Sequence, residues 1–173
     1  MGDIQDLKGR VKIRIRIMPE DKKQIHPLLF EKNKRWIGSI EKGLADLDIQ
    51  QQKLVMLEAG EECSFDILAL CEKALETTVD SVADLVRGWK LVRQSRNLHG
   101  YWMLEGYVVR GVFEECGCPI VRAGLVELKP VQCWCSQNMM EAIFSKAAKG
   151  MVSVEIRQSI GRGDKVCEFY ITF

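Results

Sequence analysis

The sequence lacks the features that mark several classes of protein. No apolar run approaches the roughly 20 residues that a membrane-spanning helix requires, and the first residues, Met-Gly-Asp-Ile-Gln-Asp, do not form the basic and apolar regions of a secretory signal. The formal net charge is only +1, so no global excess of charge indicates binding to nucleic acid. No internal repeat or low-complexity linker is present. These absences predict a cytoplasmic, globular protein.

Histidine is also scarce, and this limits the chemistry that the chain offers. His26 and His99 are the two imidazoles, and neither adjoins a cysteine in the sequence. Cysteine, in contrast, is plentiful. Seven cysteines, an odd number, in a chain expected in the reducing cytoplasm indicate free thiols or metal ligands rather than a disulfide framework.

The order of patterns predicts one α+β domain over residues 1–173. Residues 11–17 alternate strictly between apolar and basic side chains, which is typical of a strand with one buried face. Residues 21–96 carry apolar side chains at helical spacing, and residues 97–173 read mostly as strands. We therefore expect a helical N-terminal half packed on a C-terminal antiparallel sheet with one inserted helix.

Four details of this prediction depend on single residues. Gly60 is expected to interrupt the helical region, and Ser64 to cap a new helix from residue 65. Residues 120–128 read as a strand that ends at Pro130. Ser136 is expected to cap the inserted helix, over residues 137–149. Residues 161–164, Gly-Arg-Gly-Asp, lie between two strands and predict a turn rather than a phosphate-binding loop.

Two Cys-x-Cys pairs bracket the segment between residues 116 and 135. Residues i and i+2 of a strand point to the same face, so each pair would direct both sulfurs one way. A metal ion is the simplest reason for thiols to converge. The predicted ligands are Cys116, Cys118, Cys133, Cys135 and Cys167. Zinc suits such a set, an iron–sulfur centre is compatible with it, and free thiols without metal are the third alternative.

A nucleophilic cysteine is a competing interpretation. Cys133 and Cys135 directly precede a predicted helix, and the field at a helix N-terminus favours a thiolate. The same field favours a metal thiolate, so it does not discriminate. Cys71 is expected to be a small buried residue, whereas Cys63 ends a segment, residues 60–63, that could form a loop reaching the cysteine site.

The C-terminal half resembles a known family. The residues that carry the likeness are Cys133-Trp134-Cys135 before a helix, the strand over residues 152–156, and the run from Gly163-Asp164 to Cys167-Glu168-Phe169. Over residues 97–173 the chain resembles the vinyl-reductase-type small-molecule-binding domains and the related L-2-amino-thiazoline-4-carboxylic acid hydrolase-like proteins. These share their fold with subunits of a vesicle-tethering particle.

The resemblance implies a ligand site and a metal site. Domains of this family bind small aromatic or hydrocarbon-like molecules between helices and an antiparallel sheet, and several hold zinc through cysteines and an acidic residue. By this likeness Cys133 or Cys135, together with Cys167, would be zinc ligands. Ser159 stands where the family has a further cysteine, and Glu155 lies about one position from the usual acidic ligand. The pair Cys116 and Cys118 would then supply the missing thiol.

Two functional hypotheses follow, from different classes. In the first, the protein binds a small apolar or aromatic ligand without catalysis, in a pocket lined by Trp89, Tyr101, Trp102 and Phe113, and carries a cysteine metal site. These aromatic residues also suit a plain hydrophobic core. In the second, it is a small hydrolase of a thiazoline-carboxylate-like compound with Cys133 or Cys135 as nucleophile. A scaffold or tether without ligand is a third, weaker interpretation.

The strand predicted over residues 11–17 bears on oligomeric state. A strand so far in sequence from the others must pair with something. We expect it to join a sheet edge, either of its own chain or of a partner, and this predicts a homodimer.

Overall fold

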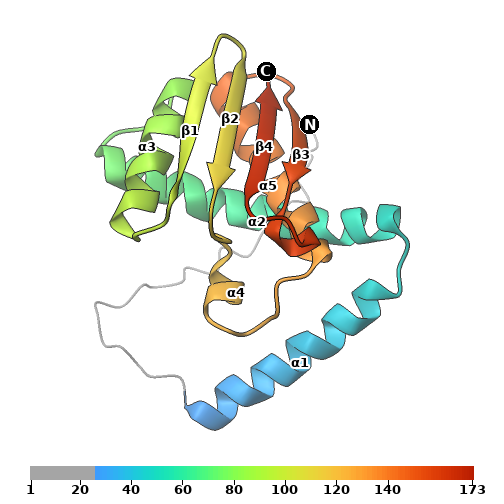
Figure 1. Ribbon diagram of the computed structural model, residues 1–173. Helices are drawn as coiled ribbons and strands as arrows, with labels where there is room; N and C mark the ends of the chain where they lie inside the picture. Colours follow the sequence, from blue (N-terminus) through green and yellow to red (C-terminus); the bar gives the residue numbers. More distant parts are fainter. Residues whose placement is uncertain (1–25) are drawn as a thin grey trace, which may run out of the picture.

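The computed structural model describes residues 26–173, and the strand predicted over residues 11–17 lies outside them. Five helices, one 3-10 helix and four strands make up this part of the chain (Figure 1). In chain order they are α1 (Pro27–Ala45), α2 (Ile49–Leu75), α3 (Val82–Ser95), β1 (Gly100–Glu105), β2 (Val108–Phe113), α4 (Pro119–Arg122), α5 (Pro130–Ala148), β3 (Ser153–Gln158), η1 (Ile160–Arg162) and β4 (Cys167–Thr172).

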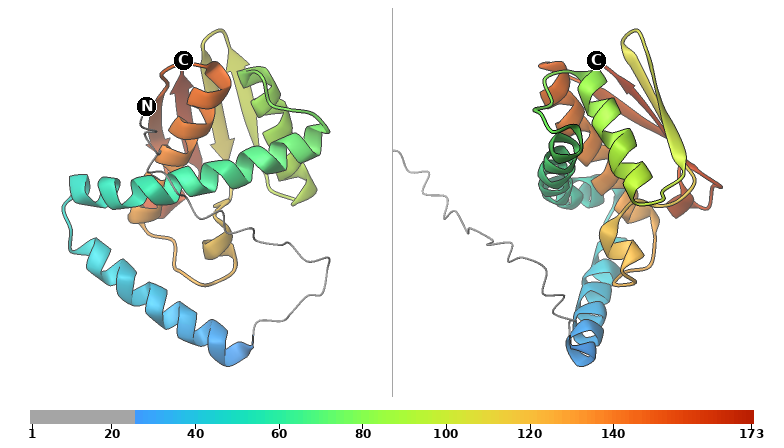
Figure 2. Two further views of the ribbon diagram at one scale, coloured as in Figure 1. Left: turned by 180° about the vertical axis from the view of Figure 1, so that it is seen from behind. Right: turned by 90° about the vertical axis from the view of Figure 1, so that its left-hand side faces the viewer.

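The strands form one antiparallel sheet in the order β1-β2-β4-β3. Helices α2, α3 and α5 lie together on one face of this sheet, as the edge-on view in Figure 2 shows. Helix α5 lies between β2 and β3 in the sequence and is the predicted inserted helix. The α+β class predicted from the sequence is therefore confirmed.

Strand alternation decides what faces the helices. Along β2, Val109, Gly111 and Phe113 are buried, while the residues between them are half-buried on the opposite face. Trp102 of β1 pairs with Gly111, and a Cβ at that glycine would lie 2.6 Å from the indole ring. The missing side chain of Gly111 therefore makes room for Trp102 in the core.

Helix α2 begins at a capping box and does not break at Gly60. The Asp48 carboxylate accepts hydrogen bonds from the backbone N–H groups of Gln50 and Gln51, and the Gln51 side chain accepts one from the Asp48 N–H. The break predicted at Gly60 is wrong. A Cβ there would lie 2.6 Å from Asn138 Cβ and 2.8 Å from the Cys135 carbonyl oxygen, so the glycine serves the contact between α2 and α5.

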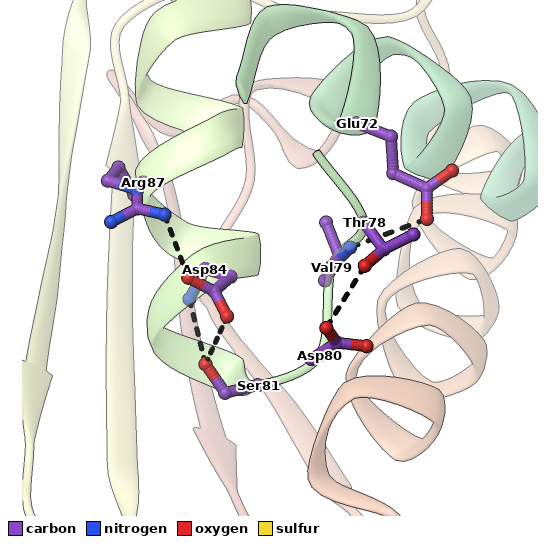
Figure 3. Close-up of polar contacts among 7 residues, drawn as sticks. All are labelled: Glu72, Thr78, Val79, Asp80, Ser81, Asp84 and Arg87. Atoms are coloured by element: carbon purple, nitrogen blue, oxygen red, sulfur yellow. Dashed lines mark hydrogen bonds and ion pairs between the residues drawn. The ribbon is translucent and has the colours of Figure 1, made fainter. Parts of the chain in front are cut away.

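The connection from α2 to α3 is fixed by short-range polar contacts (Figure 3). Ser81 caps α3 by accepting from the Asp84 N–H at 3.2 Å, and its hydroxyl donates to the Asp84 carboxylate at 2.7 Å. Asp84 also pairs with Arg87 at 2.9 Å. Since this acidic residue lies in the first turn of α3, it suits the positive end of the helix dipole.

Helix α1 lies apart from the sheet in both views of Figure 2. Its apolar side chains recur at helical spacing, but several of them, Leu29, Trp36 and Ile40 included, are exposed. Among the residues of α1 only Glu41 is buried. Its carboxylate accepts a hydrogen bond from the Gln132 side chain, and burial raises its pKa. This contact ties the end of α1 to the start of α5.

Two local predictions in the C-terminal half are wrong. Residues 120–128 do not form a strand, because α4 occupies the start of this segment and a loop the rest. Helix α5 begins at Pro130 instead of after Ser136, since proline is well suited to the first position of a helix. The turn predicted over residues 161–164 is confirmed, with Gly163 in the left-handed region at φ 96° after η1.

Candidate functional site

Three of the four aromatic residues predicted to line a ligand site meet in the core. The Trp102 ring centroid lies 5.0 Å from that of Trp89 and 5.0 Å from that of Phe113. Phe144 of α5 joins them, 5.6 Å from Trp102 and 6.2 Å from Trp89. Aromatic rings at such distances attract one another through their quadrupoles as well as through apolar burial. The cluster thus joins α3, α5 and the sheet.

The indole N–H of Trp102, within this cluster, has no hydrogen-bond partner among the described residues. The Trp102 side chain is 3% exposed, and its Nε1 is buried without a hydrogen bond to any described residue. A buried donor left unpaired costs roughly 1–3 kcal/mol. Buried tryptophan N–H groups usually find an acceptor. Arg93 Nε, beside the same cluster, is likewise buried without a partner among the described residues. These two orphan donors are therefore the features of the core that require an explanation.

Arg93 closes one side of the same cluster. Its guanidinium lies 4.1 Å from the Phe113 ring centroid and donates to the His99 carbonyl oxygen at 2.5 Å. The Glu115 carboxylate approaches it to 3.8 Å, and burial lowers the pKa of Arg93. A buried cation is thus stabilised by a carbonyl, a carboxylate and a ring face.

Tyr101 lies elsewhere. Neighbouring residues of a strand point to opposite faces, so Tyr101 lies on the face away from the helices and is 45% exposed. Arg110 lies 5.8 Å from the Tyr101 ring and 5.8 Å from the Tyr170 ring, and pairs with Glu168 at 2.6 Å. A hollow of about 150 Å³ on this face is lined by Met103, Glu105, Val108, Arg110 and Tyr170.

The two side chains of the second Cys-x-Cys pair point to different sides of the helix that carries them. Residues i and i+2 of a helix do not share a face, and both Cys133 and Cys135 belong to α5. The strand geometry assumed from the sequence is therefore wrong for this pair. Cys133 is buried, with its Sγ 2.8 Å from the Ser159 Oγ, whereas Cys135 faces α2.

Cys116 and Cys167 join Cys133 and Ser159 around one small cavity. Its volume is about 20 Å³, far below the roughly 300–1,000 Å³ of small-molecule sites. Burial raises the pKa of the Cys116 thiol and of the Cys167 thiol, so both favour the protonated form.

Residues 26–173 contain no group of three or more Cys, His, Asp or Glu side chains arranged to hold a metal ion. As placed, the three thiols at the small cavity do not form the closed ligand set that structural zinc uses, and Cys118 and Cys135 do not complete it. A zinc or iron–sulfur site stays a prediction from the sequence, which elemental analysis of the purified protein would test.

Cys63 does reach a predicted site residue, although it does so from a helix instead of a loop. Its thiol hydrogen-bonds with that of Cys135, which lowers the pKa of Cys63 to about 7. The same hydrogen bond, together with burial, raises the pKa of Cys135. Sequence reasoning missed the pairing because it depends on the crossing of α2 and α5 at Gly60.

The two histidines lie apart from the thiols. His26 caps α1 and accepts from the Leu28 N–H at 3.3 Å. His99 is 71% exposed and bonds to Glu115 at 2.5 Å. Across residues 26–173, neither imidazole is hydrogen-bonded to a cysteine. No thiol–imidazole pair of the kind that activates a cysteine nucleophile is therefore formed in this part of the chain.

Comparison with known proteins extends the description of the fold. No protein-family model matches the sequence, and no curated protein matches it. Among solved structures, the chain is similar to a trafficking protein particle complex subunit 3 from Naegleria fowleri, covalently bound to palmitic acid. The TM-score is 0.54 at 11% identity, over 84% of this chain and 92% of the other.

A further similar structure is the phenol-responsive sensory domain of the transcription activator PoxR, with phenol. The TM-score is 0.47 at 14% identity, over 84% of this chain and 72% of the other.

The similarity to the trafficking subunit shows a shared fold and nothing finer. The predicted likeness in fold to vesicle-tethering subunits is thereby confirmed, while membership of a sequence family stays a prediction. Within the described residues, no helix is long and apolar enough to cross a membrane.

Proposed function

We propose that this protein binds a small, mostly apolar or aromatic molecule in the core between α3, α5 and the sheet. The observation that carries the proposal is the buried Nε1 of Trp102, which has no acceptor among the described residues. An apolar ligand with one acceptor oxygen would satisfy this donor and leave the surrounding rings in apolar contact. Ligand sites of this kind are mainly hydrophobic with a few placed polar groups.

The aromatic cluster supplies the apolar part of such a site. Trp89, Phe113 and Phe144 surround Trp102 at ring-centroid distances of 5.0, 5.0 and 5.6 Å. Because the rings already touch, a ligand would enter by displacing one of them, and the pocket would open only as it fills. The fold neighbour that carries palmitic acid is consistent with an apolar ligand in this architecture.

The test compares two molecules of similar size and shape, anisole and ethylbenzene, since only anisole offers an acceptor oxygen and neither carries a donor. Dissociation constants are measured by calorimetry for the wild type and for Trp102→Phe, which keeps a ring and removes the donor. A hydrogen bond contributes about 0.5–1.5 kcal/mol, so anisole should bind the wild type about 2- to 12-fold more tightly than ethylbenzene does. This preference should vanish in Trp102→Phe.

Trp134→Phe is the matched control, because Trp134 lies outside the cluster, between Lys53 at 4.5 Å and Arg162 at 5.0 Å. It should retain the preference for anisole. The proposal is wrong if neither molecule binds, or if Trp102→Phe keeps the same preference as the wild type.

A further inference from the structure

Helices α2 and α5 approach each other closely at Gly60. A Cβ there would lie 2.8 Å from the Cys135 carbonyl oxygen and 2.9 Å from the Met139 amide nitrogen, both backbone atoms. The two helix backbones are therefore nearly in contact at this point. Small residues are what permit such an approach.

This crossing brings two thiols together. Cys63 follows Gly60 by three residues, so it lies one turn away on the same face of α2. On α5, Asn138 lies at the contact with Gly60. Cys135 precedes Asn138 by three residues, so it lies one turn away from the contact on the same face of α5. The Cys135 thiol lies close enough to Cys63 to lower the pKa of the Cys63 thiol, in agreement with this placement. The juxtaposition thus follows from helix geometry, with one thiol contributed by each helix.

The exposure of the pair differs from that of the core cysteines. Cys63 and Cys135 are both half-buried, whereas Cys71 and Cys133 are buried. A small solute can reach a half-buried thiol, while the surrounding helices hold the second thiol beside it. Disulfide formation requires this kind of preset approach, because the Cα atoms of a bridge lie only about 4.4–6.8 Å apart.

We propose that Cys63 and Cys135 are an oxidation site and that hydrogen peroxide converts them into a disulfide joining α2 to α5. In the first step one thiol attacks the peroxide, forming a sulfenic acid and releasing water. In the second step the neighbouring thiol attacks the sulfenic sulfur, the S–S bond forms, and a second water leaves. Two thiols lose two electrons in total, and one peroxide gains them.

The oxidation site shares no residue with the aromatic cluster, so its test does not depend on whether the proposed ligand binds. Its charged surroundings include Glu62 and Asp66 on α2, and Cys118 lies near Cys135 from the loop before α4. Cys118 could compete for a bridge, either with Cys135 or with Cys116 across one residue. The experiment must therefore identify which sulfurs are joined.

The full chain is reduced, freed of reductant and treated with a small excess of hydrogen peroxide. The remaining thiols are then blocked, and the protein is digested without reduction and mapped by mass spectrometry. We expect the loss of two of the seven thiols, one peptide pair linked through Cys63 and Cys135, and recovery of both thiols on adding dithiothreitol. Migration as a monomer on a non-reducing gel should persist.

Single variants provide the matched comparison. Cys63→Ser and Cys135→Ser should each abolish the intramolecular bridge, while Cys118→Ser should form it as the wild type does. Mapping of the wild type alone decides the question if a variant does not fold. A bridge through Cys118, a link between chains, or seven unaltered thiols would each overturn the proposal.

Discussion

The contact at Gly60 makes a quantitative prediction for the substitution Gly60→Ala. In an open helix this change is favourable by about 1 kcal/mol, because alanine has the higher helix propensity. Here the new Cβ would lie 2.6 Å from Asn138 Cβ, 2.8 Å from the Cys135 carbonyl oxygen and 2.9 Å from the Met139 nitrogen. Two of these are backbone atoms, so no side-chain rotation relieves the clash and the helices must separate.

Overpacking of this kind costs typically about 1–3 kcal/mol. We take the upper part of that range, because three atoms lie within 3.0 Å of the new Cβ. After subtraction of the gain in propensity, the expected loss in the free energy of unfolding is about 1–2 kcal/mol. For a chain of this size the melting temperature should fall by about 2–8 °C.

The assay is thermal and urea unfolding followed by circular dichroism. Gly43→Ala is the matched control, since a Cβ at this position on α1 meets nothing within 4 Å, and it should leave the melting temperature unchanged or raise it. The separation of the helices should also slow the joining of Cys63 and Cys135 by peroxide. A Gly60→Ala protein as stable as the wild type would refute the reasoning from close helix contact.

Two further predictions concern titrating groups. Burial raises the pKa of Cys71 to about 12. In the folded protein at pH 8, an alkylating reagent should therefore label Cys63 but leave Cys71 intact until denaturant is added. Equal labelling rates at the two cysteines would contradict this prediction. The hydrogen bond between His99 and Glu115 raises the pKa of His99 above 6.5 and lowers that of Glu115 below 4.5. Its stabilisation is therefore complete between about pH 4.5 and 6.5 and is lost as the pH rises through the folded pKa of His99 or falls through that of Glu115. In an NMR titration, Glu115→Gln should lower the His99 midpoint, and an unchanged midpoint would show that the pairing does not form in solution.

The sequence predicted the fold class well because period-two and helical patterns are local. The strands around residues 101–113, the final strand and the inserted helix all follow from such patterns. Cys71, predicted to be a small buried residue, has a relative exposure of 0%. This prediction is confirmed because the helical stripe that contains it is also local.

The sequence predicted the sites less well, because they depend on contacts between distant elements. Gly60 was predicted as a helix break, since its packing against Asn138 cannot be read from residues near it. The second Cys-x-Cys pair was predicted in a strand, and its placement in α5 sends Cys133 toward Ser159 and Cys135 toward α2. Cys63 and Cys135 lie near each other because Cys135 lies on the side of α5 that contacts α2 at Gly60.

Helix α1 illustrates how unevenly stability is distributed along this chain. Within residues 26–173 it buries only Glu41, near its C-terminal end, so most of its backbone hydrogen bonds can open without exposing the core. Segments with few buried contacts exchange their amide hydrogens through local opening, whereas core helices exchange only on larger unfolding. α1 should therefore act as a separate unit of hydrogen exchange, protected mainly in the turn that the Glu41–Gln132 hydrogen bond holds to α5. Substitutions in its first turns would change its own helicity while leaving the unfolding of the sheet and its covering helices unaltered.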